Sequence, residues 1–403
     1  MPSTPQPSPE RSARSLQLAQ RVNNIAPFHV MEVVKAAGAM VRAGTDVISL
    51  SVGEPDFTAA PLVAQAAIAA IENGITQYTD ALGLPALRVA IAAHYLSAFG
   101  VTVAPERIVV TAGASAALLL ACAALVDDGD EVLMPDPCYP CNRHFVAAFG
   151  GAPVLVPSGA EQRYQLSDAD VAARWRARTR GVIVASPSNP TGTSMTPAQL
   201  QAMLAAVRAR GGFAVVDEIY QGLSYDHAPV SALQFDSDVI TVNSFSKYFN
   251  MTGWRLGWLV VPESLVPAVE KLAQNLFICA SSIAQHAALA CFDPASIALY
   301  EQRRREFQRR RDYLVPQLRS LGFGVPVMPD GAFYVYADIS ALHHRLHGDS
   351  AAFSMQVLAD AAVAIVPGDD FGVAAPARHV RISYANKYER IEEAMARLAH
   401  LLT

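Results

Sequence analysis

The sequence predicts an α/β protein in which helices flank a mostly parallel sheet of seven strands, with a smaller α+β region beyond it. The chain has 403 residues, more than the ~250 at which one core usually gives way to two domains. Its composition, 52% hydrophobic and 17% charged, supplies a large core. From about residue 105, short apolar runs alternate with longer helical stretches. This alternation predicts right-handed crossovers and a parallel sheet.

Seven short segments carry the strand pattern. They are continuous runs rich in Val and Ile, which is typical of strands covered on both faces. The predicted strands are Arg107–Thr111, Glu131–Met134, Pro153–Val156, Val182–Ser186, Phe213–Asp217, Asp238–Asn243 and Gly257–Val261. Helices are predicted at Pro197–Arg210 and at the apolar run Ala114–Val126, which is shorter than the ~20 residues that span a membrane.

The chain changes character after about Pro294. Ala295–Leu321 predicts a long amphipathic helix, whose arginines at 303–305 and 309–311 are expected to face solvent. Shorter strands and a final helix are predicted at Phe333–Ala337, Ala364–Val366, His379–Ser383 and Tyr388–Leu402. We therefore expect a flexible tail over residues 1–20, a large domain over 54–290, and a small α+β domain made of 21–53 and 291–403.

Composition argues against several classes of function. The net charge is −5 and no basic run is present, so we expect no nucleic-acid partner, and no apolar segment predicts a membrane span. Five cysteines and a Pro- and Ser-rich N-terminus without an apolar leader indicate reduced thiols and a cytoplasmic protein. Cys138 and Cys141 have CxxC spacing but no second ligand pair, so no metal site is predicted. Two interpretations of Cys138 and Cys141 remain open: they form a redox pair, or they are two ordinary cysteines in a loop.

Small and polar residues follow the ends of five predicted strands. Because the carboxyl ends of parallel strands meet at one edge of a sheet, ligands bind there. The segments are Ala112-Gly113-Ala114-Ser115, Pro135-Asp136-Pro137-Cys138-Tyr139, Pro187-Ser188-Asn189-Pro190-Thr191-Gly192, Asp217-Glu218-Ile219-Tyr220 and Ser244-Phe245-Ser246-Lys247. One edge therefore gathers a helix start, an amide, a carboxylate, an amine and several hydroxyl groups.

These residue types suit an aromatic pyridinium that carries a phosphate. A helix N-terminus with small residues, as in Gly113-Ala114-Ser115, lets backbone N–H groups approach a phosphate. A carboxylate such as Asp217 keeps a ring nitrogen protonated, so that the ring attracts electrons. Lys247 can form a Schiff base with an aldehyde. Arg255, eight residues later, can neutralise the phosphate.

At these positions the chain resembles the class I/II aminotransferases of fold type I, the aspartate-aminotransferase-like group. The matching motifs are Gly53-Glu54-Pro55-Asp56-Phe57, Ser188-Asn189-Pro190-Thr191-Gly192, Asp217-Glu218-Ile219-Tyr220 and the stretch from Ser244 to Gly257 around Lys247. The resemblance runs from about residue 25 to the C-terminus. It implies a fold type I PLP-transferase that uses pyridoxal 5'-phosphate.

The resemblance also implies catalytic roles. Lys247 would hold the cofactor as a Schiff base and then move the proton at the substrate Cα. Asp217 would pair with the pyridinium nitrogen. Tyr220 and Asn189 would hydrogen-bond the ring hydroxyl.

Further roles implied by the resemblance concern binding. Phosphate would be bound by Ala114, Ser115, Ser244, Ser246 and Arg255. Tyr139 would stack on the ring, and Tyr78 would reach the phosphate of the neighbouring subunit in a homodimer with shared active sites. Arg381 would bind the substrate α-carboxylate, helped by Asn189 and the backbone of Gly53.

The reaction implied is ping-pong transamination between an amino acid and a 2-oxo acid. Some relatives that prefer aspartate carry a basic residue where this chain has Ser115, so we expect neutral or aromatic side chains to be favoured. An aspartate-specific aminotransferase and a carbon–sulfur β-lyase remain alternatives, because the same constellation serves them. A non-catalytic PLP-binding regulator is a remote alternative, since only about 25 residues precede the resemblance, too few for a DNA-binding domain.

Overall fold

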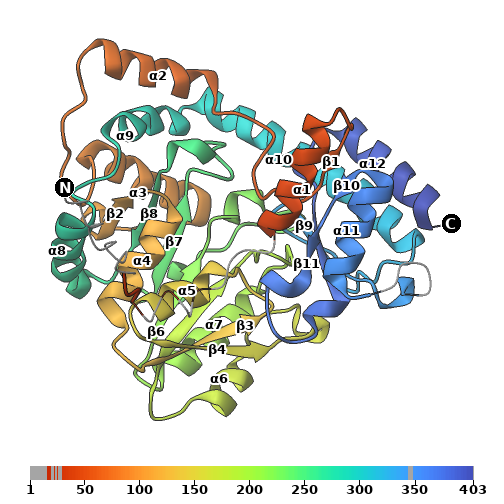
Figure 1. Cartoon of the computed structure of the whole chain (residues 1–403). Coiled ribbons are helices and arrows are strands. Elements are labelled where there is room, and N and C mark those ends of the chain that lie inside the picture. The colour runs from red at the N-terminus through yellow and green to blue at the C-terminus, as the bar shows by residue number, and fades with distance from the viewer. Residues whose placement is uncertain (1–15, 20–21, 23–24, 26–29, 344–347, 403) are drawn as a thin grey trace, which may run out of the picture.

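A seven-stranded sheet forms the centre of the computed structural model, which describes residues 16–19, 22, 25, 30–343 and 348–402 (Figure 1). The strand order is β2-β8-β7-β6-β5-β3-β4, and only β8 runs antiparallel to its neighbours. The strands are β2 (Ile108–Thr111), β3 (Glu131–Asp136), β4 (Ala152–Pro157), β5 (Thr179–Ala185), β6 (Phe213–Asp217), β7 (Ile240–Ser244) and β8 (Gly257–Val260). The predicted α/β class and mostly parallel sheet are confirmed.

Helices cover both faces of this sheet. The helices are α2 (Pro61–Glu72), α3 (Pro85–Phe99), α4 (Ala114–Leu125), α5 (Cys141–Ala148), α6 (Asp168–Arg174), α7 (Pro197–Arg208), α8 (Val266–Leu276) and α9 (Ser282–Ala288). In β5, Val182 and Val184 pack in one core cluster with Leu200 of α7, whereas Ile183 packs in another with Leu120 of α4. Both faces of the strand are therefore buried, which explains its continuous apolar sequence.

The C-terminal part contains two smaller sheets. Strands β11, β12 and β9 form an antiparallel sheet, and β1 pairs with β10 in parallel. The elements are α1 (Val30–Arg42), β1 (Ile48–Ser49), α10 (Pro294–Ser320), β9 (Tyr334–Asp338), α11 (Ser350–Ala361), β10 (Val363–Ala364), β11 (Val366–Pro367), β12 (His379–Ser383) and α12 (Tyr388–Leu402). Helix α1 packs on α11, although the two helices lie far apart in sequence (Figure 1).

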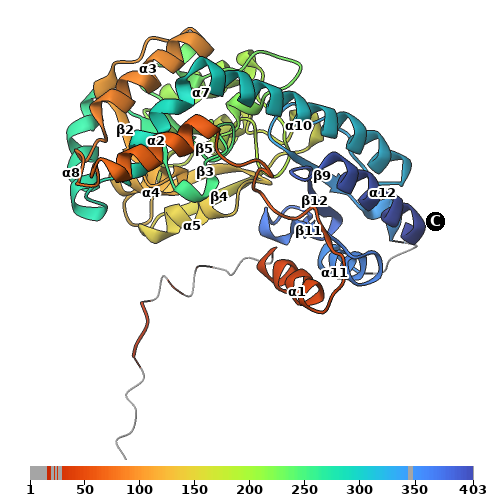
Figure 2. The same cartoon turned by 90° about the horizontal axis from the view of Figure 1, so that it is seen from above.

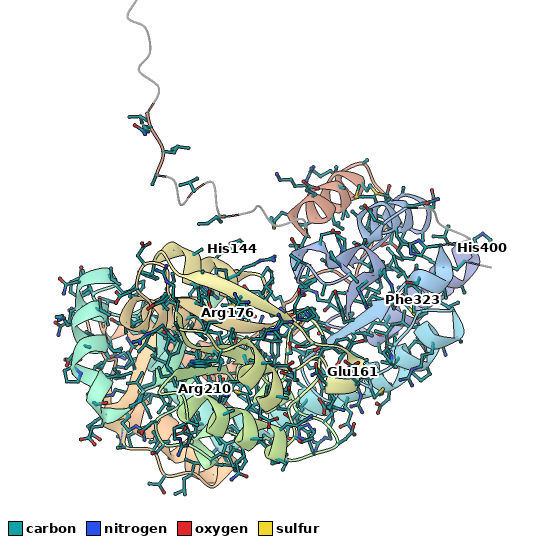
Figure 3. All side chains as sticks on the ribbon, turned by 90° about the horizontal axis from the view of Figure 1, so that it is seen from below. His144, Glu161, Arg176, Arg210, Phe323 and His400 are labelled. Atoms are coloured by element: carbon teal, nitrogen blue, oxygen red, sulfur yellow. The ribbon has the colours of Figure 1, made fainter. Side chains whose placement is uncertain are left out.

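Figure 2 shows α10 running from the region of the seven-stranded sheet toward α12. Figure 3 places His144 and Arg210 in the part built on that sheet and Phe323 and His400 at the other end of the molecule.

The proposed domain boundaries stay a prediction, and residues 1–15 and 20 of the predicted tail lie outside the described residues. No helix in the described part of the chain combines the length and apolar character that a membrane span needs.

Several predicted elements need correction. The single strand predicted at Ala364–Val366 is two strands, because β10 pairs with β1 while β11 pairs with β12. The helix predicted to end at Arg210 ends at Arg208, since Gly211 has a left-handed backbone with φ +66°. The sheet strands differ from their predicted bounds by up to three residues at an end, which reflects pairing with neighbours rather than local sequence.

The prediction that the arginines at 303–305 and 309–311 all face solvent is wrong. Arg310 and Arg311 have side chains only 4% and 3% exposed. Arg310 pairs with Asp56 and Glu306, and Arg311 pairs with Asp226 and Asp312. Buried arginines occur where carboxylates satisfy them. Two of these carboxylates, Asp56 and Asp226, lie in distant loops that a helical pattern does not reveal.

Candidate active site

A cavity of about 440 Å³ opens at the carboxyl edge of the seven-stranded sheet. It is lined by every predicted site residue except Tyr78: Gly53, Ala114, Ser115, Tyr139, Asn189, Asp217, Tyr220, Ser244, Ser246, Lys247, Arg255 and Arg381. These residues come from loops that follow different strands and from the β12 strand of the C-terminal sheet. The fold thus brings together side chains that are up to 328 positions apart, from Gly53 to Arg381.

Lys247 lies in the turn after β7. Its Nζ donates a hydrogen bond to the carbonyl oxygen of Gly53 at 2.6 Å. The pKa of the Lys247 amine is lowered from 10.5 to about 8, mainly by burial and also by Arg381 and Arg255, against the opposing effect of Glu54 and Asp217. A lysine with such a pKa is a better nucleophile near neutral pH than a surface lysine.

Asp217 ends β6, which lies between β5 and β7 in the sheet. Its side chain is buried, and one carboxylate oxygen accepts a hydrogen bond from the Ile219 amide at 3.1 Å. Burial raises the pKa of the Asp217 carboxyl from 3.8 to about 7, although the Ile219 amide and the Lys247 charge act to lower it. A cation bound against this carboxyl would restore its ionised form.

Groups suited to binding a phosphate line the cavity at the N-terminus of α4. Gly113 precedes the helix with φ +84°, and a Cβ added there would lie 2.7 Å from a guanidinium nitrogen of Arg255. Ser244 donates to the Ser246 hydroxyl at 2.9 Å, and Thr252 anchors the same turn by donating to the Ser246 carbonyl at 3.0 Å. Backbone amides, hydroxyls and a guanidinium thus converge where an anion is favoured.

Arg381 extends from β12 into the other end of the cavity. Its guanidinium donates to Asn189 Oδ1 at 3.0 Å and to the carbonyl of Ser51 at 2.7 Å, and it packs over the rings of Tyr334 and Phe371. Its buried Nε has no hydrogen-bond partner among the described residues. Arg381 also lines the cavity, so its guanidinium lies where it can bind an incoming carboxylate.

The hydroxyl groups of Tyr220 and Tyr334, which both line the cavity, form a hydrogen-bonded pair. Their hydroxyl oxygens are 2.9 Å apart, and burial raises the pKa of Tyr220 well above its ordinary value. A Cβ added at Gly53 would lie 2.5 Å from the Tyr334 hydroxyl, so any other residue there would force Tyr334 to move. Tyr334 is a site residue that the sequence reasoning missed, because it lies in an apolar strand without a motif signal.

Other lining residues were also missed. Thr252 was inside the quoted motif but received no role, whereas Val30, Met31 and Val34 come from α1, which was not predicted as a separate helix. Tyr78 is 80% exposed and does not line the cavity of its own chain. Its predicted contact with a neighbouring subunit stays a prediction.

Comparison with known proteins identifies the class. A family model for aminotransferase class I and II matches residues 45–398. A valine–pyruvate aminotransferase of Mycobacterium tuberculosis is 42% identical over 94% of this chain and 97% of its own. A probable aspartate/prephenate aminotransferase of Aquifex aeolicus is 37% identical over 96% and 98%. The structure of a Thermus thermophilus aspartate aminotransferase mutant superposes with a TM-score of 0.90 at 34% identity, covering 96% and 100%.

The fold and the site together identify a fold type I enzyme that acts on amino acids. The chain belongs to the aminotransferase class I and II family, and it is a transaminase that acts on amino acids and 2-oxo acids. Members of this class use pyridoxal phosphate. The predicted family, cofactor and reaction class are confirmed.

The residues present fit pyridoxal phosphate. Asp217 is a buried carboxyl that a protonated ring nitrogen would stabilise in its charged form. The absence of a Cβ at Gly113 leaves Arg255 next to the start of α4, where a phosphate would be held. Lys247 is the lysine of the cavity, with a lowered pKa suited to covalent attachment.

Substitution of Gly113 tests the predicted phosphate-binding groups. We predict that Gly113→Ala weakens cofactor binding about tenfold, or ~1.4 kcal/mol, because the new methyl group displaces the Arg255 guanidinium. Gly100→Ala is the matched control, since Gly100 has φ +66° and open space around it. Both variants should lose stability through backbone strain, but only Gly113→Ala should raise the dissociation constant measured by spectral titration of the apo-protein. Equal affinities for the two variants would contradict the assignment.

The pKa of Lys247 predicts a pH dependence. Cofactor uptake by the apo-protein needs the neutral amine, so its rate should rise with pH up to about 8 and then level off. The measurement is the rate of the absorbance change on mixing cofactor with apo-protein across a pH series. A rate that continues to rise toward pH 10.5, the ordinary pKa of lysine, would show that the pKa of Lys247 is not lowered.

Proposed function

We propose that this transaminase takes its amino group from a neutral or aromatic L-amino acid, in preference to aspartate, and passes it to a 2-oxo acid by a ping-pong mechanism. The observation that carries the preference is the charge of the cavity wall. Among the described lining residues the charged ones are Asp217, Lys247, Arg255 and Arg381. Each of them is engaged by the cofactor or by the α-carboxylate in this proposal, so none is left for a second substrate carboxylate.

Apolar side chains supply the remaining wall. Val30, Met31 and Val34 of α1, together with Val52 and Leu118, line the same cavity. A branched or aromatic substrate side chain gains free energy by burial against such groups, whereas an unpaired carboxylate there is costly. The similarity to a valine–pyruvate aminotransferase supports the same preference.

The site residues divide the chemistry as follows. Pyridoxal phosphate, when bound, supplies an electron-withdrawing ring that stabilises the charge left when a Cα–H bond breaks. Asp217 holds the proton of the ring nitrogen, and Tyr220 hydrogen-bonds the ring hydroxyl together with Asn189. Arg381, which lines the cavity, binds the α-carboxylate through its guanidinium. Lys247 anchors the cofactor and then takes and returns the proton at the substrate Cα.

The remaining roles concern binding. The phosphate would be held by Ala114, Ser115, Ser244, Ser246 and Arg255. Tyr139 covers the ring, and the Gly53 backbone helps to position the substrate carboxylate. We further propose a cytoplasmic homodimer with shared active sites. The 80% exposure of Tyr78 supports its contact with the neighbouring subunit, and the cysteines, all free thiols, support a reducing compartment.

A panel of half-reactions tests the proposed donor. We expect valine, methionine or phenylalanine to change the spectrum of the bound cofactor at least about tenfold faster than aspartate, because an uncompensated carboxylate is disfavoured in the cavity. Lys247→Ala is the control and should lose covalent attachment of the cofactor. Faster turnover of aspartate would overturn the preference, and release of ammonia and pyruvate from a cysteine conjugate without an acceptor would favour a lyase.

A charge added at Ser115 tests the same idea from the protein side. We predict that Ser115→Lys raises the rate with aspartate relative to valine about tenfold, since a charge-assisted hydrogen bond contributes ~1.5–3 kcal/mol. Ser115→Met is the matched control, because it has a long side chain without charge. The measurement is the ratio of kcat/KM values for the two donors. An equal change in both variants would mean that the added bulk, not the charge, sets the ratio.

A further inference from the structure

Helix α10 presents two pairs of arginines to two different parts of the protein. Arg303 and Arg310 are seven residues apart, and so are Arg304 and Arg311, so each pair lies along one side of the helix. Arg304 and Arg311 bind the loop around Asp226, through the Ser224 carbonyl and the Asp226 carboxylate. The other pair faces the segment Gly53–Thr58, which borders the active site.

Arg310 anchors this segment through its acidic side chain. Its guanidinium makes two hydrogen bonds to Asp56, at 2.7 and 3.0 Å, and a third to Glu306 at 3.1 Å. It also lies 5.1 Å from the ring centre of Phe57 and 5.2 Å from that of Phe307. A buried arginine that packs beside two aromatic rings and binds a carboxylate in bidentate fashion fixes both the position and the direction of its partner.

Arg303 joins the same segment to the turn that carries Lys247. One guanidinium nitrogen donates to the Thr58 carbonyl at 2.6 Å and to Asn250 Oδ1 at 2.8 Å. The side-chain amide of Asn250 in turn donates to the carbonyl of Lys247 at 2.9 Å. The Lys247 turn is therefore tied to α10 through one intervening side chain.

The two arginines thus hold both sides of one contact. Gly53 accepts the hydrogen bond from Lys247 Nζ, and the segment of Gly53 is fixed by Arg310 while the turn of Lys247 is fixed by Arg303. We propose that Arg303 and Arg310 are positioning residues for this transaminase, which set the place of the Lys247 amine relative to the Gly53 carbonyl. The proposal rests on the assigned role of Lys247 as the lysine that holds the cofactor.

Loss of the contacts made by Arg303 and Arg310 should change the pKa of the Lys247 amine. The charged groups that face its amine are Arg381, Arg255, Glu54 and Asp217. Those residues would remain, but the Gly53 carbonyl would no longer accept its hydrogen bond at full strength. Because a hydrogen bond to the charged form favours that form, the amine should titrate at lower pH when the contact is weakened.

The test compares Arg303→Met and Arg310→Met with the matched control Arg311→Met, because Arg304 is linked through Glu301 to Tyr248, the neighbour of Lys247. Arg310 and Arg311 are equally buried, so both substitutions should lower the thermal midpoint of the apo-protein by similar amounts. Only the Arg303 and Arg310 variants should move the pH profile of cofactor uptake down by about one unit. They should also lower the half-reaction rate about tenfold or more, with little change in KM.

Conservative variants separate positioning from folding. Arg310→Lys keeps the charge and should restore most of the stability while leaving the pH profile displaced, because lysine cannot make the bidentate contact to Asp56. If Arg310→Met does not fold, Arg303→Met and Asp56→Asn give the same comparison. A pH profile of cofactor uptake that is the same for Arg303→Met and Arg310→Met as for Arg311→Met would overturn the proposal. Cofactor uptake that is the same in the Lys247→Ala variant as in the wild-type protein would instead overturn the proposed function itself.

Discussion

The site depends on one constraint, the parallel pairing of β5, β6 and β7. Ala185 of β5 pairs with Asp217 of β6, and Asp217 pairs with Val242 of β7. Because these strands run in the same direction, the loops that follow them begin at the same edge. Asn189, Asp217 and Lys247 thereby reach one cavity although each belongs to a different crossover unit. The connection from β7 to the antiparallel strand β8 places Arg255 beside the start of α4.

Burial shifts the pKa values of the two ionisable groups at the centre of the cavity, Asp217 and Lys247. It raises the pKa of Asp217 and lowers that of Lys247, so both groups are displaced from their ordinary charged forms in the direction that desolvation dictates. Such opposed shifts mark acid–base sites. A cationic ring nitrogen near the carboxylate and an anionic phosphate at the helix start would compensate these effects, which explains why one zwitterionic ligand suits the whole cavity.

The sequence predicted the parts that depend on local pattern. Continuous apolar strands, the motifs at their ends and the final helix Tyr388–Leu402 were predicted correctly, since each is encoded within a short segment. Long-range partners were not predictable in the same way. Arg310 and Arg311 look like solvated helix residues until Asp56 and Asp226 are seen beside them. Tyr334 likewise becomes a site residue only because β9 places its hydroxyl between Tyr220 and Gly53.

The central claim, that Lys247 binds the cofactor covalently, has a direct test because the chain contains few lysines. They are Lys35, Lys247, Lys271 and Lys387, and the other three are exposed. Holoenzyme reduced with borohydride, digested and mapped by mass spectrometry should carry the pyridoxyl group on the peptide of Lys247, in stoichiometric amount. Label on another lysine, or label spread over the exposed ones, would contradict the account.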